Sequence, residues 1–228
     1  NSNIYAFSWY LDLVSNNWEG LIYGDYELVF PIIFKKQVFL KKIYHPLFCQ
    51  QLGPFASNQK LLHNANVVSD ILHFLVFRYK KFTFSINHHF SDLFKKIIKE
   101  NKLFINYLDR VNLELDLSNP YERIQSSYST NHMRTLKTND VDLKWDVETK
   151  INIDYVNEFI LLYRQYIGVK ARLKANSYAI MKSIMCHSFQ TNIGCLIGLR
   201  DEKSQLLGAA FFTISCNRDI LLFNFSKK

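Results

Sequence analysis

Two arginines and two hydroxyl side chains recur at helical spacing near the middle of the chain. Arg123, Ser127, Thr130 and Arg134 stand at positions i, i+4, i+7 and i+11, so one continuous helix would bring them onto a single face. Arginine binds phosphate oxygens through paired N–H donors, and hydroxyl groups add further hydrogen bonds. The spacing therefore predicts an anion-contacting face for a phosphate-bearing ligand. The alternative is a solvated helix face whose arginines pair with acidic neighbours.

A second motif has the spacing of a phosphate-binding loop but lies in the wrong structural context to bind phosphate. Residues 205–210 satisfy the spacing Q-x-x-G-x-A of a pyrophosphate-binding loop. Such a loop works because its backbone N–H groups converge at the N-terminus of a helix, where the helix dipole favours anions. Here the motif runs into Phe211-Phe212-Thr213-Ile214, which is typical of a strand. Strand amides are committed to the sheet, so we exclude this motif as an anion site.

Metal ligands and catalytic triads do not emerge from the sequence. The four cysteines are scattered, without a CxxC pair or metal-binding Cys/His spacing, and are expected to be reduced. His88 and His89 are adjacent, which on a strand would point them to opposite faces. Cys186 and His187 are also adjacent and cannot aim well at each other on a helix. We expect no metal and assign no general acid or base.

Composition limits the classes of protein. The chain has 228 residues, of which 48% are hydrophobic, enough to bury a sizeable core. The net charge of +8 favours anionic partners such as nucleotides, RNA or an anionic lipid surface, although lysines solvating ordinary faces would give the same charge. No apolar run approaches the roughly 20 residues that span a bilayer, and no secretion signal opens the sequence. We therefore expect a cytoplasmic protein without a membrane span.

Periodicity predicts an α+β lobe in the first 111 residues. Residues 5–14 carry a helical apolar stripe, and residues 18–23 and 26–34 form a hairpin around a tight Gly24-Asp25 turn, most simply of type II′. Pro31 places the second run at a sheet edge or a bulge. Further along we expect a helix over 67–79, a strand over 82–86, a short helix over 93–98 and a strand over 103–108.

The segment 112–140 is predicted to connect two lobes. Residues 112–117 alternate, with Leu113, Leu115 and Leu117 expected to face inward on a strand. The run Asn119-Pro120-Tyr121-Glu122 combines three helix-start signals, so a polar helix should extend to about Lys137.

Residues 141–228 predict a second lobe of order β-α-α-β-β-β. A strand is expected over 142–147, and helices begin near Asp154 and Ser177. Three strands follow over 193–199, 206–215 and 220–225, the last two joined by a turn at 216–219.

This order resembles the first part of the acyl-CoA N-acyltransferase (GNAT) fold. The whole chain resembles the Fem-type aminoacyltransferases, which look like two GNAT-like domains in tandem. The residues that carry the resemblance are spaced and mostly apolar: Trp9-Tyr10-Leu11, Gly24-Asp25-Tyr26, Pro31, residues 50–54, residues 113–117, Tyr121-Glu122, Tyr128, Arg134, Lys137, Phe159, Leu162-Tyr163, Tyr178, Gly194, residues 207–210 and Ser226.

The resemblance implies a transferase that moves an acyl group from a CoA thioester or an aminoacyl-tRNA to an amine. It implies two tandem domains, residues 1–111 and 141–228, each with a mixed, mostly antiparallel sheet flanked by helices. Acetyl-CoA or another acyl-CoA would be the cofactor. Arg123 and Arg134 would contact the anion, Gln50 and Gln51 would line the inter-domain cleft, and Asn224 would lie on the acyl-facing strand.

The resemblance also implies that the second domain is C-terminally incomplete. The cofactor loop would follow the strand over 220–225, and the sequence ends at Lys228. The strand would then present an exposed edge that favours self-association. The rival hypothesis is a non-catalytic GNAT-fold protein whose basic cleft binds RNA or another anionic partner, with aromatic side chains as stacking platforms.

Overall fold

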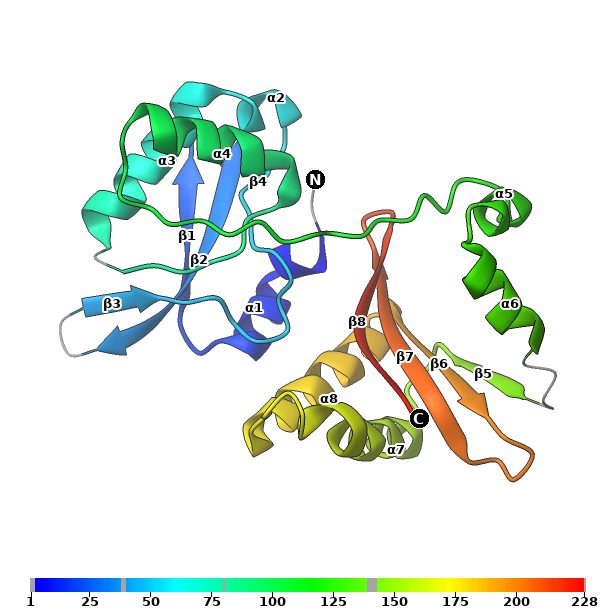
Figure 1. Ribbon diagram of the computed structural model, residues 1–228. Coiled ribbons are helices and arrows are strands. Elements are labelled where there is room, and N and C mark those ends of the chain that lie inside the picture. The colour runs from blue at the N-terminus through cyan, green and yellow to red at the C-terminus, as the bar shows by residue number, and fades with distance from the viewer. Residues whose placement is uncertain (1–2, 38–39, 80, 139–142, 228) are drawn as a thin grey trace.

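The computed structural model describes residues 3–37, 40–79, 81–138 and 143–227, and contains two separate antiparallel sheets with helices around each (Figure 1). The expected α+β class is therefore confirmed. All the strand pairs within the described residues are antiparallel, where mixed, mostly antiparallel sheets were expected. The tandem GNAT architecture and the domain boundaries remain predictions.

The chain begins with η1 (Ile4–Ala6) and α1 (Ser8–Val14), followed by the hairpin of β1 (Trp18–Tyr23) and β2 (Leu28–Gln37). The predicted hairpin is confirmed, but its turn is longer than predicted. Tyr23 pairs with Leu28, so four residues form the loop, and Gly24 and Tyr26 have φ of 62° and 57°. Two left-handed residues in the loop explain why a two-residue II′ turn does not form.

Pro31 lies at a break in the pairing of β2. On one side of β2, β4 (Phe55–Ala56) pairs with Leu28 and Val29, and β3 (Leu40–Ile43) pairs with residues 34–37. Pro31 falls between these two pairings and is opposite Gly20 on β1. A proline, which lacks a backbone N–H, is tolerated at such a position. The expectation that this run would be an edge strand or contain a bulge is wrong, because β2 lies between β1 and β3 and its register with β1 is continuous. The proline is accommodated in the gap between the β4 and β3 pairings.

Three helices pack with this first sheet: α2 (Gln59–Leu62), α3 (Ala65–Arg78) and α4 (His88–Glu100). Asn64 and Asn87 cap α3 and α4 by accepting hydrogen bonds from backbone N–H groups in the first turn. The predicted strand over 82–86 is wrong, because these residues form no regular structure. Their aromatic rings still pack on the core, with Phe30 and Phe84 rings 5.1 Å apart. The core draws on strands and helices alike: Leu28, Phe30, Ile32, Ile43, Val67, Val68, Ile71, Leu72, Leu75, Phe90, Phe94, Ile97 and Ile98.

An extended segment, residues 103–117, links the two halves of the chain without forming a strand (Figure 1). The strands predicted over 103–108 and 112–117 are therefore wrong. Leu113 is 90% exposed, and Leu115 and Leu117 are 59% exposed each, so the alternating leucines do not face a core. Alternation produces a half-buried strand only when a partner strand and a core lie beside it. Within the described residues no strand pairs with residues 112–117, and their leucines belong to neither buried cluster. Only Leu103 and Ile105, at the start of the segment, pack against the first core.

The predicted polar helix is two helices, α5 (Tyr121–Ser126) and α6 (Thr130–Thr138). Ser126 and Ser127 end the first one by donating hydrogen bonds from their Oγ atoms to the carbonyl oxygens of Arg123 and Ile124, at 2.7 and 2.6 Å. Serine hydroxyls that bond nearby carbonyls compete with helix continuation. The break separates the two arginines that a continuous helix would have aligned.

The second sheet has the predicted β-α-α-β-β-β order. It consists of β5 (Lys144–Glu148), α7 (Ile153–Tyr163) with the π-helical turn η2 (Arg164–Gly168), α8 (Ala175–Gln190), β6 (Gly194–Arg200), β7 (Leu206–Ser215) and β8 (Arg218–Ser226). The strands follow each other in space as β5-β6-β7-β8. Ser215 pairs with Arg218, so Cys216 and Asn217, with φ of 54° and 56°, form a two-residue turn of type I′ geometry.

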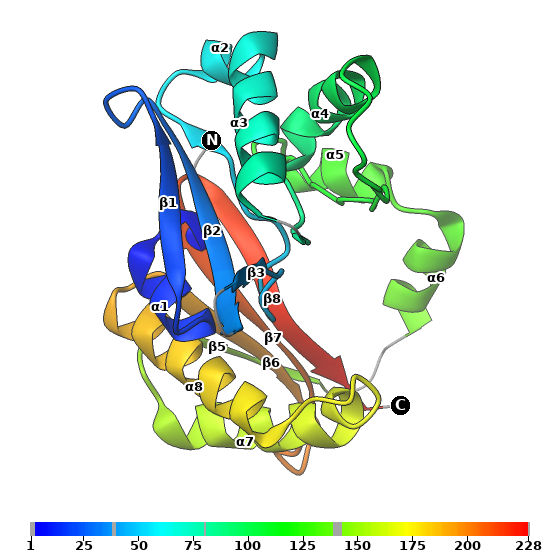
Figure 2. The ribbon, with the colours of Figure 1, turned by 90° about the vertical axis from the view of Figure 1, so that its left-hand side faces the viewer.

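The core of this second sheet includes the N-terminus of the chain. Ile4, Tyr5, Tyr10 and Leu11 belong to the same buried cluster as side chains of α7, α8, β6, β7 and β8. Figure 2 shows α1 beside α8, and Figure 1 shows the same neighbours from another side. The Tyr5 and Tyr10 rings meet edge to face, with centroids 5.4 Å apart. The N-terminal segment therefore belongs to this core, to which Ile33, Cys49 and Leu52 from the first half of the chain also contribute.

One close contact fixes α7 on this sheet. Gly198 of β6 faces the Tyr155 side chain of α7, and a Cβ atom at Gly198 would lie 1.7 Å from the Tyr155 hydroxyl oxygen and 2.8 Å from Leu206 Cδ1. Tyr155 is 7% exposed and has little room to move. Only glycine leaves space for this ring.

We predict that Gly198→Ala lowers the free energy of unfolding by about 1–3 kcal/mol, the usual cost of overpacking. Adding Tyr155→Phe removes the hydroxyl that clashes, so the double variant should regain part of that loss. Chemical denaturation of the wild type, both single variants and the double variant checks this. Additive effects of the two substitutions would contradict the proposed contact.

Candidate functional site

The outer edge of β8 is the most distinctive local feature of the second sheet. β8 ends the strand order, so within the described residues only β7 pairs with it. Phe223 pairs with Phe211 and Leu221 pairs with Phe212, which leaves Leu222 as an extra residue on β8. Such a β-bulge bends the strand and redirects its backbone groups. The bulge thus places irregular backbone on an open sheet edge.

A loop from the first half of the chain contacts this bulge. Gln50 Nε2 donates a hydrogen bond to the carbonyl oxygen of Leu221 at 3.1 Å. Beside it, the Phe48 ring meets the Phe223 ring edge to face at 5.0 Å. Residues 44–52 and β8 therefore build one surface, which we call the β8-edge site: Phe48, Gln50, Leu221, Leu222, Phe223 and Asn224.

The loop is firmly anchored. The Tyr10 hydroxyl donates to the Phe48 carbonyl oxygen at 2.6 Å, and Phe48 has a φ of 67°, a left-handed conformation that non-glycine residues rarely adopt. The Ser85 N–H donates to His45 Nδ1 at 3.2 Å, so the ring proton lies on Nε2, which donates to the Cys49 carbonyl oxygen at 2.6 Å. These bonds hold Gln50 in place before any ligand arrives.

Burial lowers the pKa of His45. Its hydrogen bond to the Cys49 carbonyl acts in the opposite direction, and the nearby positive charge of Arg110 lowers the pKa further. The neutral imidazole is also the form that the two hydrogen bonds require, because Nδ1 must accept. Protonation would turn Nδ1 into a donor facing the Ser85 N–H.

Aromatic side chains form a wall next to the β8-edge site. Tyr163 of α7 lies 6.3 Å from the Phe223 ring, and Tyr166 stacks on Phe225 at 6.1 Å with a 9° angle between the ring planes. Tyr166 belongs to the π-helical turn η2, and such turns occur frequently at functional sites. Burial raises the pKa of Tyr163, and Tyr178 raises it further, so this hydroxyl stays protonated at neutral pH.

The structure brings together some of the predicted site residues and separates others. Gln50 and Asn224 both lie at the edge of β8: Asn224 is exposed and stands two residues after Leu222. Gln51 is half-buried beside Gln50. Arg123 is on α5 and Arg134 is on α6, where Arg134 Nη2 donates to Asn131 Oδ1 at 3.3 Å. The single-helix alignment that motivated both arginines is wrong, while their role in binding stays a prediction.

Sequence reasoning missed several residues of the site. His45, Phe48 and Tyr166 carry no motif, and their roles depend on contacts between distant parts of the chain. The bulge did leave a signal. Ile220, Leu221, Leu222 and Phe223 are four apolar residues in a row, which interrupts the alternation expected of a strand with one buried face.

Another depression, of about 620 Å³, lies along β5 and the start of α7. Arg200, one of the residues that line it, donates hydrogen bonds to Glu158 from Nη1 at 3.1 Å and from Nη2 at 2.7 Å. It also donates from Nε to Asp146 and from Nη1 to the Ser204 carbonyl oxygen at 3.0 Å. The guanidinium group also covers the Tyr155 ring. Because these partners occupy the guanidinium group, the cluster ties β5, β6 and α7 together.

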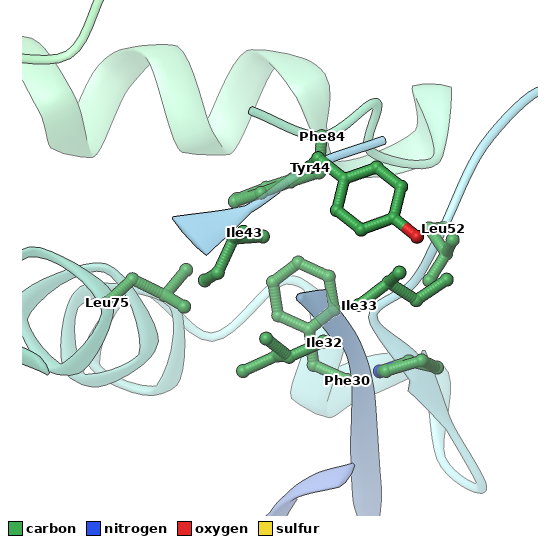
Figure 3. Close-up of a pocket in the computed structure, with 9 residues that line it drawn as sticks. Phe30, Ile32, Ile33, Ile43, Tyr44, Leu52, Leu75 and Phe84 are labelled. Atoms are coloured by element: carbon green, nitrogen blue, oxygen red, sulfur yellow. The ribbon is translucent and has the colours of Figure 1, made fainter. Parts of the chain in front are cut away.

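The first half of the chain contains a small apolar cavity of about 10 Å³, shown in Figure 3. It lies between the sheet and α3, among side chains that include Phe30, Ile43, Leu75 and Phe84. A cavity of this size holds at most about one water molecule. It has no room for a substrate.

Two further features of the described residues bear on the class of protein. They contain no group of three or more His, Cys, Asp or Glu side chains placed to hold a metal ion. None of the helices within the described ranges is long and apolar enough to cross a membrane. Burial raises the pKa of the Cys49 thiol, which disfavours a thiolate nucleophile there.

Comparisons with known proteins give no family. No protein-family model matches the chain, and no curated protein matches its sequence.

The environment of His45 predicts a pH-dependent stability. Because the folded pKa lies below the ordinary value of 6.5, the contribution of His45 is complete above pH 6.5 and is lost as the pH falls through the folded pKa. The free energy of unfolding should therefore decrease more steeply between pH 7.5 and 5.5 in the wild type than in His45→Gln. Denaturation at several pH values measures both slopes, and equal slopes would refute the assignment.

Proposed function

We propose that the chain provides the acyl-transfer site of an acyltransferase, which moves an activated acyl group from a nucleotide-bearing carrier to an amine. The bulged, open edge of β8, with Gln50 held against it, is the observation that supports this proposal. It lies within a β-α-α-β-β-β unit, the order in which the resemblance to the GNAT fold was found. The carrier would be a CoA thioester or an aminoacyl-tRNA, as the resemblance implies.

The reaction would require that the acyl carbonyl is polarised and that the amine is positioned beside it. The acyl carbonyl would lie along β8, and its oxygen would accept hydrogen bonds from outward backbone N–H groups near Leu222. Donors aimed at the developing negative charge stabilise the transition state. The amine nitrogen attacks the carbonyl carbon and forms the C–N bond, and the C–S or C–O bond to the carrier breaks. The departing thiolate or alkoxide takes up the proton that the amine loses.

The side chains around the edge would then have distinct tasks. The Gln50 and Asn224 amides can orient the acyl carbonyl and the incoming amine, since each offers both a donor and an acceptor. Gln51 would line the same cleft, and the aromatic wall of Tyr163 and Tyr166 would exclude water. Holding two reactants in register supplies much of the acceleration in such reactions, so a strong general base is not required.

The carrier must be anionic, and the net charge of +8 suits it. Arg123 and Arg134 remain our candidates for contact with its phosphates. They are exposed on α5 and α6, and each can still bind a phosphate oxygen without being aligned with the other.

We predict that Gln50→Ala and Asn224→Ala each lower kcat/KM for acyl transfer about tenfold or more, because both amides contact the reacting groups. Gln205→Ala is the matched control, since Gln205 is exposed on the β6–β7 turn. The assay follows thiol release from acetyl-CoA with a panel of amines, and a parallel arm uses aminoacyl-tRNA. Equal activity of all three variants would place the reaction elsewhere.

The wild type and these variants also distinguish a transferase from the rival function, a non-catalytic binder of anions. If no acyl transfer occurs and thermal shifts appear with acetyl-CoA, bulk tRNA and heparin alike, all erased by salt, the protein is a non-catalytic binder of anions. A shift with acetyl-CoA that survives high salt supports the transferase.

We also predict that Arg134→Ala weakens binding of the nucleotide-bearing carrier by about tenfold, the effect of one lost charge-assisted contact. Lys203→Ala removes the same charge from an exposed turn and should change the affinity much less. Titration calorimetry measures affinity, and circular dichroism confirms that each variant is folded. An unchanged affinity for Arg134→Ala would remove this residue from the binding site.

A further inference from the structure

The opposite edge of the second sheet is formed by β5, which, unlike β8, has no bulge in its pairing with the neighbouring strand. β5 pairs only with β6 within the described residues, and the depression of about 620 Å³ runs along it. An exposed strand edge is a template for pairing with another strand, and proteins usually protect it. The described residues place no covering strand there.

The exposed face of β5 is unusually apolar for an edge. Trp145 is 70% exposed and Val147 is 64% exposed, and both project from the same face of the strand. Ile151 and Ile153, just beyond the strand, are 48% and 44% exposed. Large apolar side chains exposed together on an edge strand are typical of an interaction site.

The sequence of β5 is complementary to itself. If two copies pair in antiparallel fashion about Asp146, Lys144 of each copy lies opposite Glu148 of the other, and Trp145 lies opposite Val147. This register gives two opposite-charge pairs and two aromatic–aliphatic pairs, which stabilise neighbouring strands. A register centred on Val147 would instead place Asp146 opposite Glu148, which is repulsive.

The charges on the neighbouring strand support the same register. Asp146 would meet its own copy at the two-fold axis, but its carboxylate already accepts a hydrogen bond from Arg200 Nε. Lys144 is exposed at the outer edge of the sheet, where it can pair with an acidic group of a second copy. Glu148 of a second copy supplies such a group.

We propose that β5 is a homodimer interface, through which two copies form one continuous antiparallel sheet about a two-fold axis. The pairing is isologous, as in most symmetric dimers, because the same strand contributes on both sides. It differs from association through β8, whose edge is contacted by Gln50. The proposal does not depend on the transferase function.

The test is a charge-reversal series analysed by sedimentation velocity over a range of concentrations. The wild type should form a dimer that dissociates on dilution. Glu148→Lys places like charges opposite each other and should weaken dimerisation at least tenfold. Lys144→Glu combined with Glu148→Lys restores opposite charges and should restore the dimer.

Two controls accompany this series. Val147→Lys should also weaken the dimer, while Leu221→Lys on β8 should leave it unchanged; circular dichroism confirms that each variant is folded. A wild type that is monomeric throughout the concentration range overturns the proposal. So does a dimer that Glu148→Lys leaves intact, or one that only Leu221→Lys disrupts.

Discussion

The burial of the N-terminal aromatic residues in the core of the second sheet is the interaction on which the rest of the structure depends. Tyr5 and Tyr10 come from the first ten residues, and both are fully buried among side chains of α7, α8 and the last three strands. Aromatic rings of this size dominate the apolar area that a core removes from water. The two halves of the chain therefore fold around a shared cluster, although their sheets are separate.

This shared core also positions the β8-edge site. The Tyr10 side chain reaches from α1 to the Phe48 carbonyl, and Phe48 packs on Phe223 of β8. The same loop is tied to the first sheet's side of the molecule through His45 and Ser85. Gln50 is thus fixed from both directions. A site assembled from rigid neighbours in this way can hold two reactants in register without a large closing motion.

The sequence predicts the helices and strands of this protein better than it predicts which segments pair or pack with one another. The helices α3 and α7 have clear apolar stripes, and the strands β6 to β8 are long apolar runs bounded by polar turns; all are present. Residues 112–117 have equally clean alternation but no strand partner, because periodicity describes one segment and says nothing about what lies beside it. The two-helix break at Ser126 and Ser127 depends on local side-chain bonds that compete with the helix, a detail that start signals do not report.

The candidate site was predictable only in part for the same reason. Gln50 and Asn224 were predicted as site residues from the resemblance to the Fem-type aminoacyltransferases and not from any spacing rule. The bond from Gln50 to Leu221 joins residues 171 positions apart, and no spacing rule covers that distance.

The two edges of the second sheet have different surroundings. This difference assigns the proposed acyl transfer to the β8 edge and the proposed dimerisation to the β5 edge. The β8 edge is bulged and is met by a loop and an aromatic wall, which favours recognition of a small group over addition of another strand. The β5 edge is regular and carries exposed Trp145 and Val147, and its charges complement a second copy. Because the strand order is β5-β6-β7-β8, joining two copies at β5 leaves the two β8 edges at opposite ends of the combined sheet. A dimer formed in this way keeps both β8-edge sites open, so association through β5 and acyl transfer at β8 are compatible in the same molecule.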